Sequence, residues 1–313
     1  MNGFDLSTIS NCYMGSTPMS AIYYGSNKIW PTHDYSQDYL TIIPRSTAYV
    51  CYDNCMGHSQ GYYSLDDGVT WTPFPAYDVN TWQNNTSVQV QANQHILLKD
   101  DPYTASTIYA GHIHVTEQYD VQGNIMSIIH GDNYTTQTYM WLGPRQFFYN
   151  ESNLVNAKDL SLSLMTLTSS CYQDMFNGCT SLLTAPELPA TTLATGCYRT
   201  MFHGCISLLT APELPATTLA TECYHGMFSS CTSLVNAPEL HAATLVQGCY
   251  KDMFNGCTSL NYIKCLATNN SATDCTYYWT WNVGASGTFV KEANTTWTTG
   301  ADGIPSGWTV QNA

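Results

Sequence analysis

The sequence predicts a multidomain chain: an N-terminal all-β region, then a short α/β solenoid of stacked repeats, then a β-rich C-terminal cap. Three observations predict this order. A unit of 26 residues recurs through the C-terminal half, β-forming runs separated by turn residues fill the first 125 positions, and a segment rich in Gly, Thr and Trp follows the last repeat. The 313 residues are enough for about two domains with a substantial core.

The composition excludes several classes of protein. Nine Lys and Arg against 23 Asp and Glu give a net charge of −14, and the basic residues are scattered, which argues against a nucleic-acid binder. A hydrophobic content of 44% argues against disorder, and no apolar run reaches the ~18 residues of a membrane span. The start, MNGFDLSTISNCYMG, has neither a basic end nor an apolar segment, so we expect no signal peptide.

The N-terminal region divides into three expected parts. Residues 1–33 carry the runs AIYY and KIW around Gly25-Ser26-Asn27, which predicts a β-hairpin in an attachment segment. Residues 34–125 are expected to form an Ig-like β-sandwich domain, and 126–146 to connect it to the repeats. The sandwich runs are YLTII at 39–43, TAYVCY at 47–52, VQVQ at 88–91, HILL at 95–98 and HIHVTEQYDV at 112–121.

The repeat region is expected to span residues 147–268 and the cap residues 269–313. Four copies of C-Y-x-x-M-F-x-x-C begin at Cys171, Cys197, Cys223 and Cys249, and residues 179–204 match 205–230 at 20 of 26 positions. An earlier, atypical unit starts with Phe147-Phe148 in place of Met-Phe and has Glu151 in place of the second Cys.

Each repeat is expected to have a helical and a strand-like half. Cys171, Met175 and Cys179 are spaced i, i+4 and i+8, which predicts one apolar stripe of a short helix, and the positions that vary between repeats lie off this stripe. The run SLLTAPEL predicts a short strand, weakened where proline removes a hydrogen-bond donor. The expected strand-like segments are 154–160, 182–188, 208–214, 234–240 and 260–266, with prolines at Pro186, Pro212 and Pro238.

Stacking of these units would bury both halves in one continuous core. The residues expected to form this core are Cys171, Met175, Cys179, Leu182, Leu188, Cys197, Met201, Cys205, Leu208, Leu214, Cys223, Met227, Cys231, Leu234, Leu240, Cys249, Met253 and Cys257.

The period of 26 residues lies within the ~20–29 residues of leucine-rich repeats. The order C-x-S-L-x-x-A-P-E-L-P-A-T-T-L-A-x-x-C-Y-x-x-M-F resembles the BspA-like leucine-rich repeats of Bacteroidetes, Bacteroides among them, and of their phages. The similarity covers about 147–266, and the segment 284–310 resembles the cap of such arrays. MSAIYYGSNKIWPT and VQGNIMSIIHGDNY are similar to segments of phage and prophage proteins. No asparagine ladder of the general leucine-rich type is present.

The resemblance implies attachment to a surface. It favours a virion fibre or decoration protein of a bacteriophage, folded in the host cytoplasm, released by lysis and displayed on the virion surface. The implied partners are other virion proteins, further copies of the chain in a homo-oligomer (a trimer is our expectation), and a host glycan or capsule for receptor binding and adhesion. A bacterial cell-surface adhesin with the same repeats is the alternative, and a glycan-active enzyme is a third reading.

The enzyme reading depends on one short motif. Ser64, Asp66, Gly68, Thr70 and Trp71 fit S-x-D-x-G-x-T-W, which resembles the Asp-box of sialidase propellers. A propeller glycosidase would need several copies of this motif and arginines for an acidic sugar, whereas the chain has one copy and three arginines. A tight hairpin, stabilised by the aspartate, is therefore the favoured interpretation, and we expect no catalytic residues and no enzymatic activity.

Other candidate sites also have structural interpretations. The repeat cysteines are expected to be buried thiols, neither a disulfide ladder nor a zinc site; Cys51 and Cys55 could form a disulfide. His112 and His114 could chelate a metal but are expected to be a simple strand pair, so no cofactor or metal is expected. Glu187, Glu213 and Glu239 recur in successive repeats and are the candidate ligand-facing residues, either as an acidic stripe or as a solvated rim.

Overall fold

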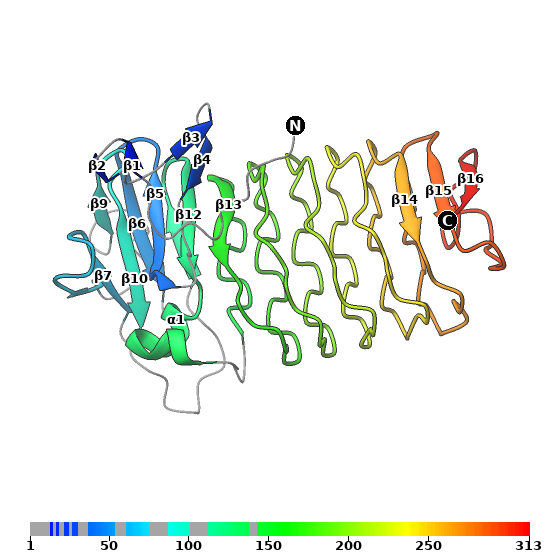
Figure 1. Cartoon of the computed structure of the whole chain (residues 1–313), viewed down its shortest axis with the longest axis horizontal. Coiled ribbons are helices and arrows are strands. Elements are labelled where there is room, and N and C mark those ends of the chain that lie inside the picture. The colour runs from blue at the N-terminus through cyan, green and yellow to red at the C-terminus, as the bar shows by residue number, and fades with distance from the viewer. Residues whose placement is uncertain are drawn as a thin grey trace.

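The chain is β-rich, with several sheets and one short α-helix among the residues that are described. The computed structural model describes residues 37–53, 61–75, 87–100, 112–137 and 143–313, together with four short strands between positions 13 and 30. Figure 1 shows an elongated molecule with the N-terminal sheets at one end, a row of side-by-side coils, and three parallel strands at the other end.

Four short strands precede the first sheet. β1 (Tyr13–Met14) pairs with β2 (Thr17–Pro18), and β3 (Ile22–Tyr24) pairs antiparallel with β4 (Asn27–Trp30). The β3–β4 pair confirms the hairpin predicted around Gly25 and Ser26.

Two larger sheets follow, and their inward residues belong to one buried core. Alternation of buried and exposed residues is clear in β11, where Ile113 and Val115 are buried while His112 and His114 are not. The larger sheet has the order β13 (Leu154–Ser161), β12 (Tyr119–Asn124), β5 (Leu40–Pro44), β10 (Ile96–Asp100), β7 (Gly61–Ser64), β8 (Thr72–Pro73). The smaller has the order β11 (His112–Val115), β6 (Ala48–Asp53), β9 (Val88–Val90).

The connector contains α1 (Ser127–His130) and the 3-10 helix η2 (Gly131–Thr136). The buried hydroxyl of Ser127 accepts a hydrogen bond from the Leu40 amide at 3.0 Å and donates one to the Leu98 carbonyl at 2.9 Å. The connector is therefore fixed to the large sheet by hydrogen bonds as well as by packing of Ile128.

The first repeat continues the large sheet. β13 pairs in parallel with β12, with irregularities in register near Asp120, so the expected boundary at residue 147 crosses a continuous hydrogen-bonded sheet. At the other end β14 (Tyr262–Cys265), β15 (Thr288–Lys291) and β16 (Thr309–Asn312) are also parallel. The β-rich character expected for the cap is thus present.

The expected helix over each C-Y-x-x-M-F-x-x-C segment is wrong: these residues form consecutive turns. The Met175 amide donates to the carbonyl of Tyr172, three residues back, whereas the Phe176 amide donates to Met201 in the next coil at 2.9 Å. Asp174 and Gly178 have positive φ, which an α-helix does not allow. Alternate amides are therefore free to join neighbouring coils.

The same pattern recurs from coil to coil and aligns identical side chains. Phe176, Phe202 and Phe228 stack with ring centroids 5.3 and 5.6 Å apart, and interplanar angles of 3° and 4°. Tyr198 and Tyr224 stack in a parallel column at 5.9 Å. All residues expected in the repeat core are buried, although the helix that was used to predict them is absent.

Proline has the expected effect on the strand-like segments. Regular strands form at β13 and β14, whose sequences contain no proline, and not at 182–188, 208–214 or 234–240. Only isolated parallel bridges join the latter segments to their neighbours, such as Asn156 with Thr184 and Asn236 with Tyr262. The coils are therefore held together mainly by their turns and by core packing.

Candidate functional site

The three candidate ligand-facing glutamates have different surroundings. Glu187 and Glu213 are exposed, and together they line a shallow groove of 260 Å³ whose walls are largely proline. Glu239 is half-buried, and its Oε1 lies 2.8 Å from Lys264 Nζ and 3.5 Å from His241 Nδ1. The structure therefore brings two of the three glutamates to one groove and places the third in an ion pair.

Aliphatic side chains at successive repeat positions are exposed on the same segments. Leu183, Leu209 and Val235 are 42%, 54% and 39% exposed, although each follows a fully buried leucine. Thr184, Thr210 and Asn236, the next residues along the chain, are also exposed. This strand face, defined by these six residues with Glu187 and Glu213, offers apolar and polar groups in rows.

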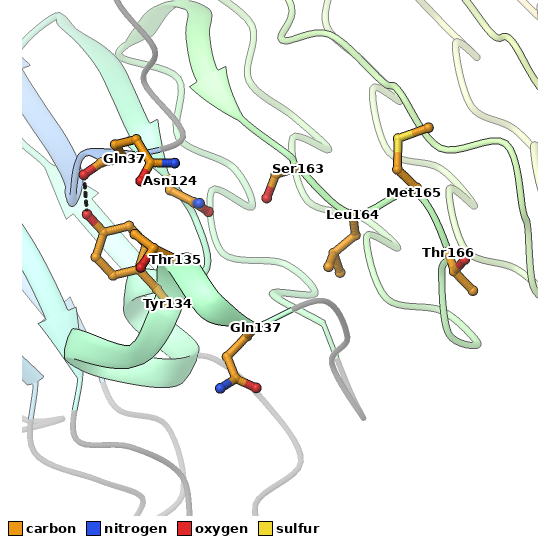
Figure 2. Close-up of a pocket in the computed structure, with 9 residues that line it drawn as sticks. All are labelled: Gln37, Asn124, Tyr134, Thr135, Gln137, Ser163, Leu164, Met165 and Thr166. Carbon is orange, nitrogen blue, oxygen red and sulfur yellow. Dashed lines mark hydrogen bonds between the residues drawn. The ribbon is translucent and has the colours of Figure 1, made fainter.

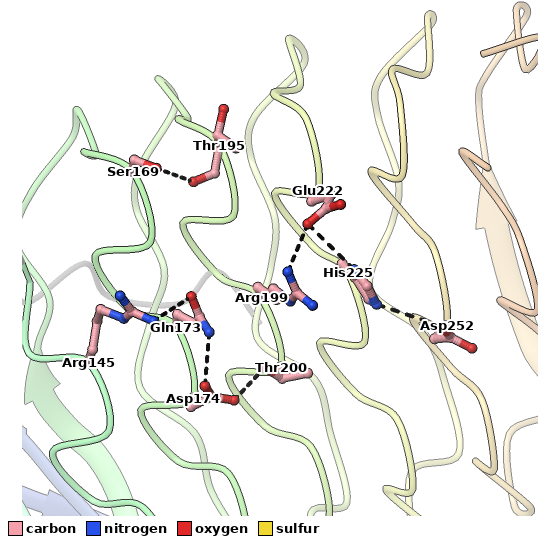
Figure 3. Close-up of polar contacts among 10 residues, drawn as sticks. All are labelled: Arg145, Ser169, Gln173, Asp174, Thr195, Arg199, Thr200, Glu222, His225 and Asp252. Atoms are coloured by element: carbon pink, nitrogen blue, oxygen red, sulfur yellow. Dashed lines mark hydrogen bonds and ion pairs between the residues drawn. The ribbon is translucent and has the colours of Figure 1, made fainter. Parts of the chain in front are cut away.

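The opposite half of each repeat presents a polar turn face, formed by Gln173, Arg199, His225 and Lys251 with the residues that contact them. Figure 3 shows that these contacts cross from coil to coil. Arg145 donates to Gln173 at 2.9 Å, Gln173 to Asp174 at 3.1 Å, and Thr200 donates a hydrogen bond to Asp174. Polar side chains thus link three consecutive coils on the outside, as the aromatic columns do inside.

A second cluster extends the turn face. Arg199 Nη1 donates to Glu222 Oε2 at 2.9 Å, and the two ring nitrogens of His225 lie 3.8 Å from Glu222 and 3.7 Å from Asp252 (Figure 3). Desolvation, and then the positive charge of Arg199, lower the pKa of His225. The cluster therefore favours neutral His225, while Glu222 pairs with Arg199 and Asp252 accepts a hydrogen bond from Asn255.

A polar cavity of 450 Å³ lies where the N-terminal sheets meet the first coil (Figure 2). One side is formed by Asn124, Tyr134 and Gln137, and the other by the segment 163–166. Tyr134 Oη donates to the Gln37 carbonyl at 2.6 Å, which fixes one wall. The described residues of its lining carry amide and hydroxyl groups and no carboxylate or amine, so this part of the cavity suits neutral hydrogen-bonding ligands.

The Asp-box motif forms the tight turn between β7 and β8. Asp66 accepts hydrogen bonds from the Thr70 hydroxyl at 2.6 Å, the Thr70 amide at 2.8 Å and the Ser64 hydroxyl at 2.7 Å. These bonds, those from Thr70 first, lower the pKa of Asp66 to about 2. Gly68 has φ of +86°, and Trp71 packs edge-on against Tyr39 at 4.8 Å. The carboxylate of Asp66 is thus hydrogen-bonded to groups of its own turn.

His112 and His114 contact the first repeat. His112 Nε2 lies 2.6 Å from the Tyr149 carbonyl, and His114 Nδ1 lies 2.9 Å from Glu151. Glu151 is buried and also accepts from the Val115 amide and the Tyr119 hydroxyl. The hydrogen bond to Glu151 raises the pKa of His114. Within the described ranges no three His, Cys, Asp or Glu residues are grouped as metal ligands.

The repeat cysteines are buried thiols. Cys179, Cys205, Cys231 and Cys257 each donate an S–H hydrogen bond to the carbonyl of a phenylalanine in the preceding coil, at 3.0–3.1 Å. Burial raises the pKa of Cys197 and Cys257 to about 12, so these thiols stay protonated at neutral pH. Cys55 lies outside the described residues, so its pairing with Cys51 stays a prediction.

Sequence reasoning missed two of these features. Glu151 was recognised as a replacement for cysteine, yet its partners on β11 are far away in the sequence and no local pattern indicates them. The cross-coil cluster around Arg199 and Glu222 also depends on stacking, although the spacing of 23 residues is close to one period. A search for oppositely charged residues about one repeat apart could therefore have found the Arg199–Glu222 pair.

Comparison of the chain with family models, curated proteins and solved structures gave no match. Among the described residues, no helix has both the length and the apolar character needed to cross a bilayer.

Proposed function

We propose that the chain is a structural attachment protein of a phage particle, a fibre or decoration, that contacts a glycan or capsule on the host surface. In this proposal the coils are a BspA-like leucine-rich-repeat solenoid and the two N-terminal sheets an Ig-like sandwich that joins the chain to its own copies or to the particle. The resemblance of the repeats and of two N-terminal segments to phage and prophage proteins motivates the choice.

One observation carries the proposal: cross-coil hydrogen bonds align equivalent residues into rows on an exposed strand face and a half-buried turn face. Leu183, Leu209 and Val235 form one such row, and Gln173, Arg199, His225 and Lys251 another. A row of similar groups about 5 Å apart suits a repetitive polymer, because several weak contacts can form at once. Multiple copies on a particle would strengthen this binding further.

The state of the cysteines supports a virion protein over a secreted adhesin. The eight cysteines of the four repeat motifs are buried thiols that donate to carbonyls or pack in the core. A chain that folds in a reducing cytoplasm keeps such thiols, whereas secreted proteins commonly use cysteines for disulfides. The adhesin remains the alternative, because its repeats would offer the same faces.

The Asp-box geometry supports attachment over glycan hydrolysis. Both carboxylate oxygens of Asp66 accept hydrogen bonds from the turn itself, and its pKa near 2 is opposite to that of a general acid.

Location and adsorption together test this proposal. Antibodies against residues 147–268 should label intact phage particles in electron micrographs and block adsorption to host cells. Antibodies against an unrelated capsid protein provide the control for steric blocking. Labelling of the envelope of phage-free bacteria would instead indicate the adhesin, and labelled particles with unaffected adsorption would contradict an attachment role.

A further inference from the structure

The last coil departs from the polar turn face of the earlier coils. Tyr277 lies 26 residues after Lys251 and is the next member of the series Gln173, Arg199, His225 and Lys251. Trp281 likewise lies one repeat after Asn255, in the series Asn177, His203, Ser229 and Asn255. Tyr278 lies one repeat after Asp252. Three outward positions that were polar in the preceding coil therefore become aromatic together.

Backbone hydrogen bonds show that this alignment is structural. The amides of Asp252, Phe254 and Gly256 donate to the carbonyls of Tyr277, Trp279 and Trp281 at 2.8–2.9 Å, as in the earlier coils. Trp279 takes the inward position and is fully buried. The core therefore keeps its own aromatic residue, and packing does not require the three that point outward.

These outward rings form a connected, accessible cluster. Tyr277 and Trp281 are 42% and 53% exposed, and Tyr278 lies between them, with ring centroids 4.5 Å from Tyr277 and 5.4 Å from Trp281. Lys251 Nζ lies 5.4 Å from the Tyr277 ring centre. Tyr278 has a φ of +51°, like Asp174, Thr200 and Asp252 at the same position of the earlier coils, so its backbone follows the repeat. An exposed aromatic cluster of this kind is typical of a binding site.

A small hollow adjoins the cluster. Trp281 lines a cavity of 170 Å³ together with Asn282, Ser306 and the backbone of Gly284 and Gly300. This volume is below the ~300–1,000 Å³ of sites for drug-sized ligands, so it admits one ring with its substituents. The lining offers amide and hydroxyl groups beside an aromatic surface, and it contains no charged side chain.

We propose that Tyr277, Tyr278 and Trp281 form a carbohydrate-binding site, in which the apolar face of a neutral pyranose ring stacks on the exposed indole. This inference rests on the proposed function and names the face and the sugar class. The apolar C–H face of such a ring matches an aromatic surface, while its hydroxyls and any N-acetyl group match Asn282, Ser306 and the Lys251 ammonium.

Nearby charges favour a neutral sugar over an acidic one. Asp302 lies beside the cluster, where its Oδ1 accepts a hydrogen bond from the Tyr278 amide at 2.6 Å. Desolvation, then Tyr278, and then the charges of Asp302 and Asp274 raise the pKa of Tyr277. The chain as a whole carries a charge of −14. A uronic or sialic acid would be repelled by both, so neutral hexoses and N-acetylhexosamines are the expected ligands.

The preceding coil supplies well-matched substitutions for a test. Trp281→Asn and Tyr277→Lys install the residues found at the same positions one coil earlier, Asn255 and Lys251, so the fold is expected to tolerate them. Ile206→Thr removes a comparably exposed apolar side chain that belongs to neither face, installs the residue found at the same position in the neighbouring coils (Thr180 and Thr232), and serves as the control. Thermal unfolding of each full-length variant would verify that the fold is retained.

Binding is measured by saturation-transfer NMR with methyl glycosides of glucose, galactose, mannose, N-acetylglucosamine and N-acetylgalactosamine, and by adsorption of the labelled protein to host cells. At least one glycoside should bind the native chain and the Ile206→Thr variant, with about tenfold weaker binding for each aromatic variant. Trp281→Phe should retain part of the affinity if Trp281→Asn proves unstable.

Failure of the sugar-binding site can be distinguished from failure of the proposed attachment function. Equal sugar binding by all variants, or no binding of any glycoside while the native chain still adsorbs to cells, would overturn the site and leave the attachment function intact. Loss of self-association in the Trp281→Asn variant without any sugar binding would assign the cluster to a second copy of the chain and likewise overturn the proposal. No adsorption by the native chain would contradict the proposed function itself.

Discussion

The N-terminal sheets and the repeat coils build their cores in different ways. In the coils, each buried side chain stacks on the equivalent residue of the next repeat, and the Phe176–Phe202 contact spans one period. In the sheets, buried neighbours come from unrelated positions, such as Tyr52 with Phe74 and with Phe147. In the coils, the sequence period alone tells which residues pack together. In the N-terminal sheets it does not, so the core of the coils is predicted far better from sequence than that of the sheets.

Removing one ring from an aromatic column should have the largest effect. Phe202→Ala deletes a fully buried side chain between Phe176 and Phe228, so unfolding free energy should fall by about 3–5 kcal/mol. Chemical denaturation of the two proteins would measure it. Leu209→Ala, on the exposed surface of the same coil, should change stability by less than about 0.5 kcal/mol, and equal losses for both would contradict the assigned burial.

The junction between the two regions should be the next most sensitive place. Glu151→Ala leaves the Val115 amide and the Tyr119 hydroxyl without their buried acceptor, and should cost about 3 kcal/mol. Glu151→Gln keeps an acceptor and should cost less.

The same junction predicts a pH effect. Because His114 has a raised pKa in the fold, its contribution to stability is complete below the unfolded value of ~6.5 and is lost as pH rises through the folded value. NMR titration should show the raised pKa of His114, and Glu151→Gln should lower it. An unchanged pKa in that variant would exclude the ion pair as its cause.

The thiols of the coils should make them sensitive to alkali. Cys197, Cys249, Cys257 and Cys265 have pKa values raised to about 12 by burial. The unfolded chain ionises near ~8.5, so stability should be full below that pH and decline between it and 12. At neutral pH the repeat cysteines should resist a small alkylating reagent until the chain is denatured. Complete labelling of the native protein would contradict their burial.

The Asp66 turn should have the smallest effect on stability. Its pH dependence should run opposite to that of His114 and the cysteines, because stability is lost as pH falls. Its pKa is lowered to about 2, so the contribution of Asp66 is present above ~4 and is lost as pH falls toward 2. Asp66→Asn should remove this acid dependence and should lower stability at neutral pH by about the amount that the native chain loses on acidification. A drop in stability at neutral pH as large as that of Phe202→Ala would assign the turn a different role.

The sequence was sufficient to identify the repeat core, but not its backbone. The spacing of Cys171, Met175 and Cys179 satisfies a helix of 3.6 residues per turn and equally a series of turns that repeats every four residues. Positive φ at Asp174 and Gly178, together with bonding of alternate amides to the next coil, distinguishes the two, and these depend on the neighbouring repeat. The prolines, by contrast, act locally, and their effect on the strands was predicted correctly.

The binding surfaces were harder to predict because they depend on what lies beside each residue. Glu187, Glu213 and Glu239 are equivalent in sequence, yet Lys264 from the last strand-like segment pairs only with Glu239. Four of the predicted runs match β5, β6, β9 and β10 within one or two residues, whereas β7 and β8 were not among the predicted runs. The run 112–121 contains β11 and the start of β12, which lie in different sheets. Sheet assignment requires the long-range pairing that single runs do not encode.

Deleting one complete repeat tests most directly whether the coils stack in register. Removal of residues 205–230 joins Gly204 to Cys231, which preserves every equivalent contact, and the shortened protein should unfold in one cooperative step with its length reduced by about 5 Å in small-angle scattering. Removal of only the first half of the same segment shifts all later columns and should abolish cooperative unfolding. Equal stability of the two deletions, or collapse of both, would contradict the account.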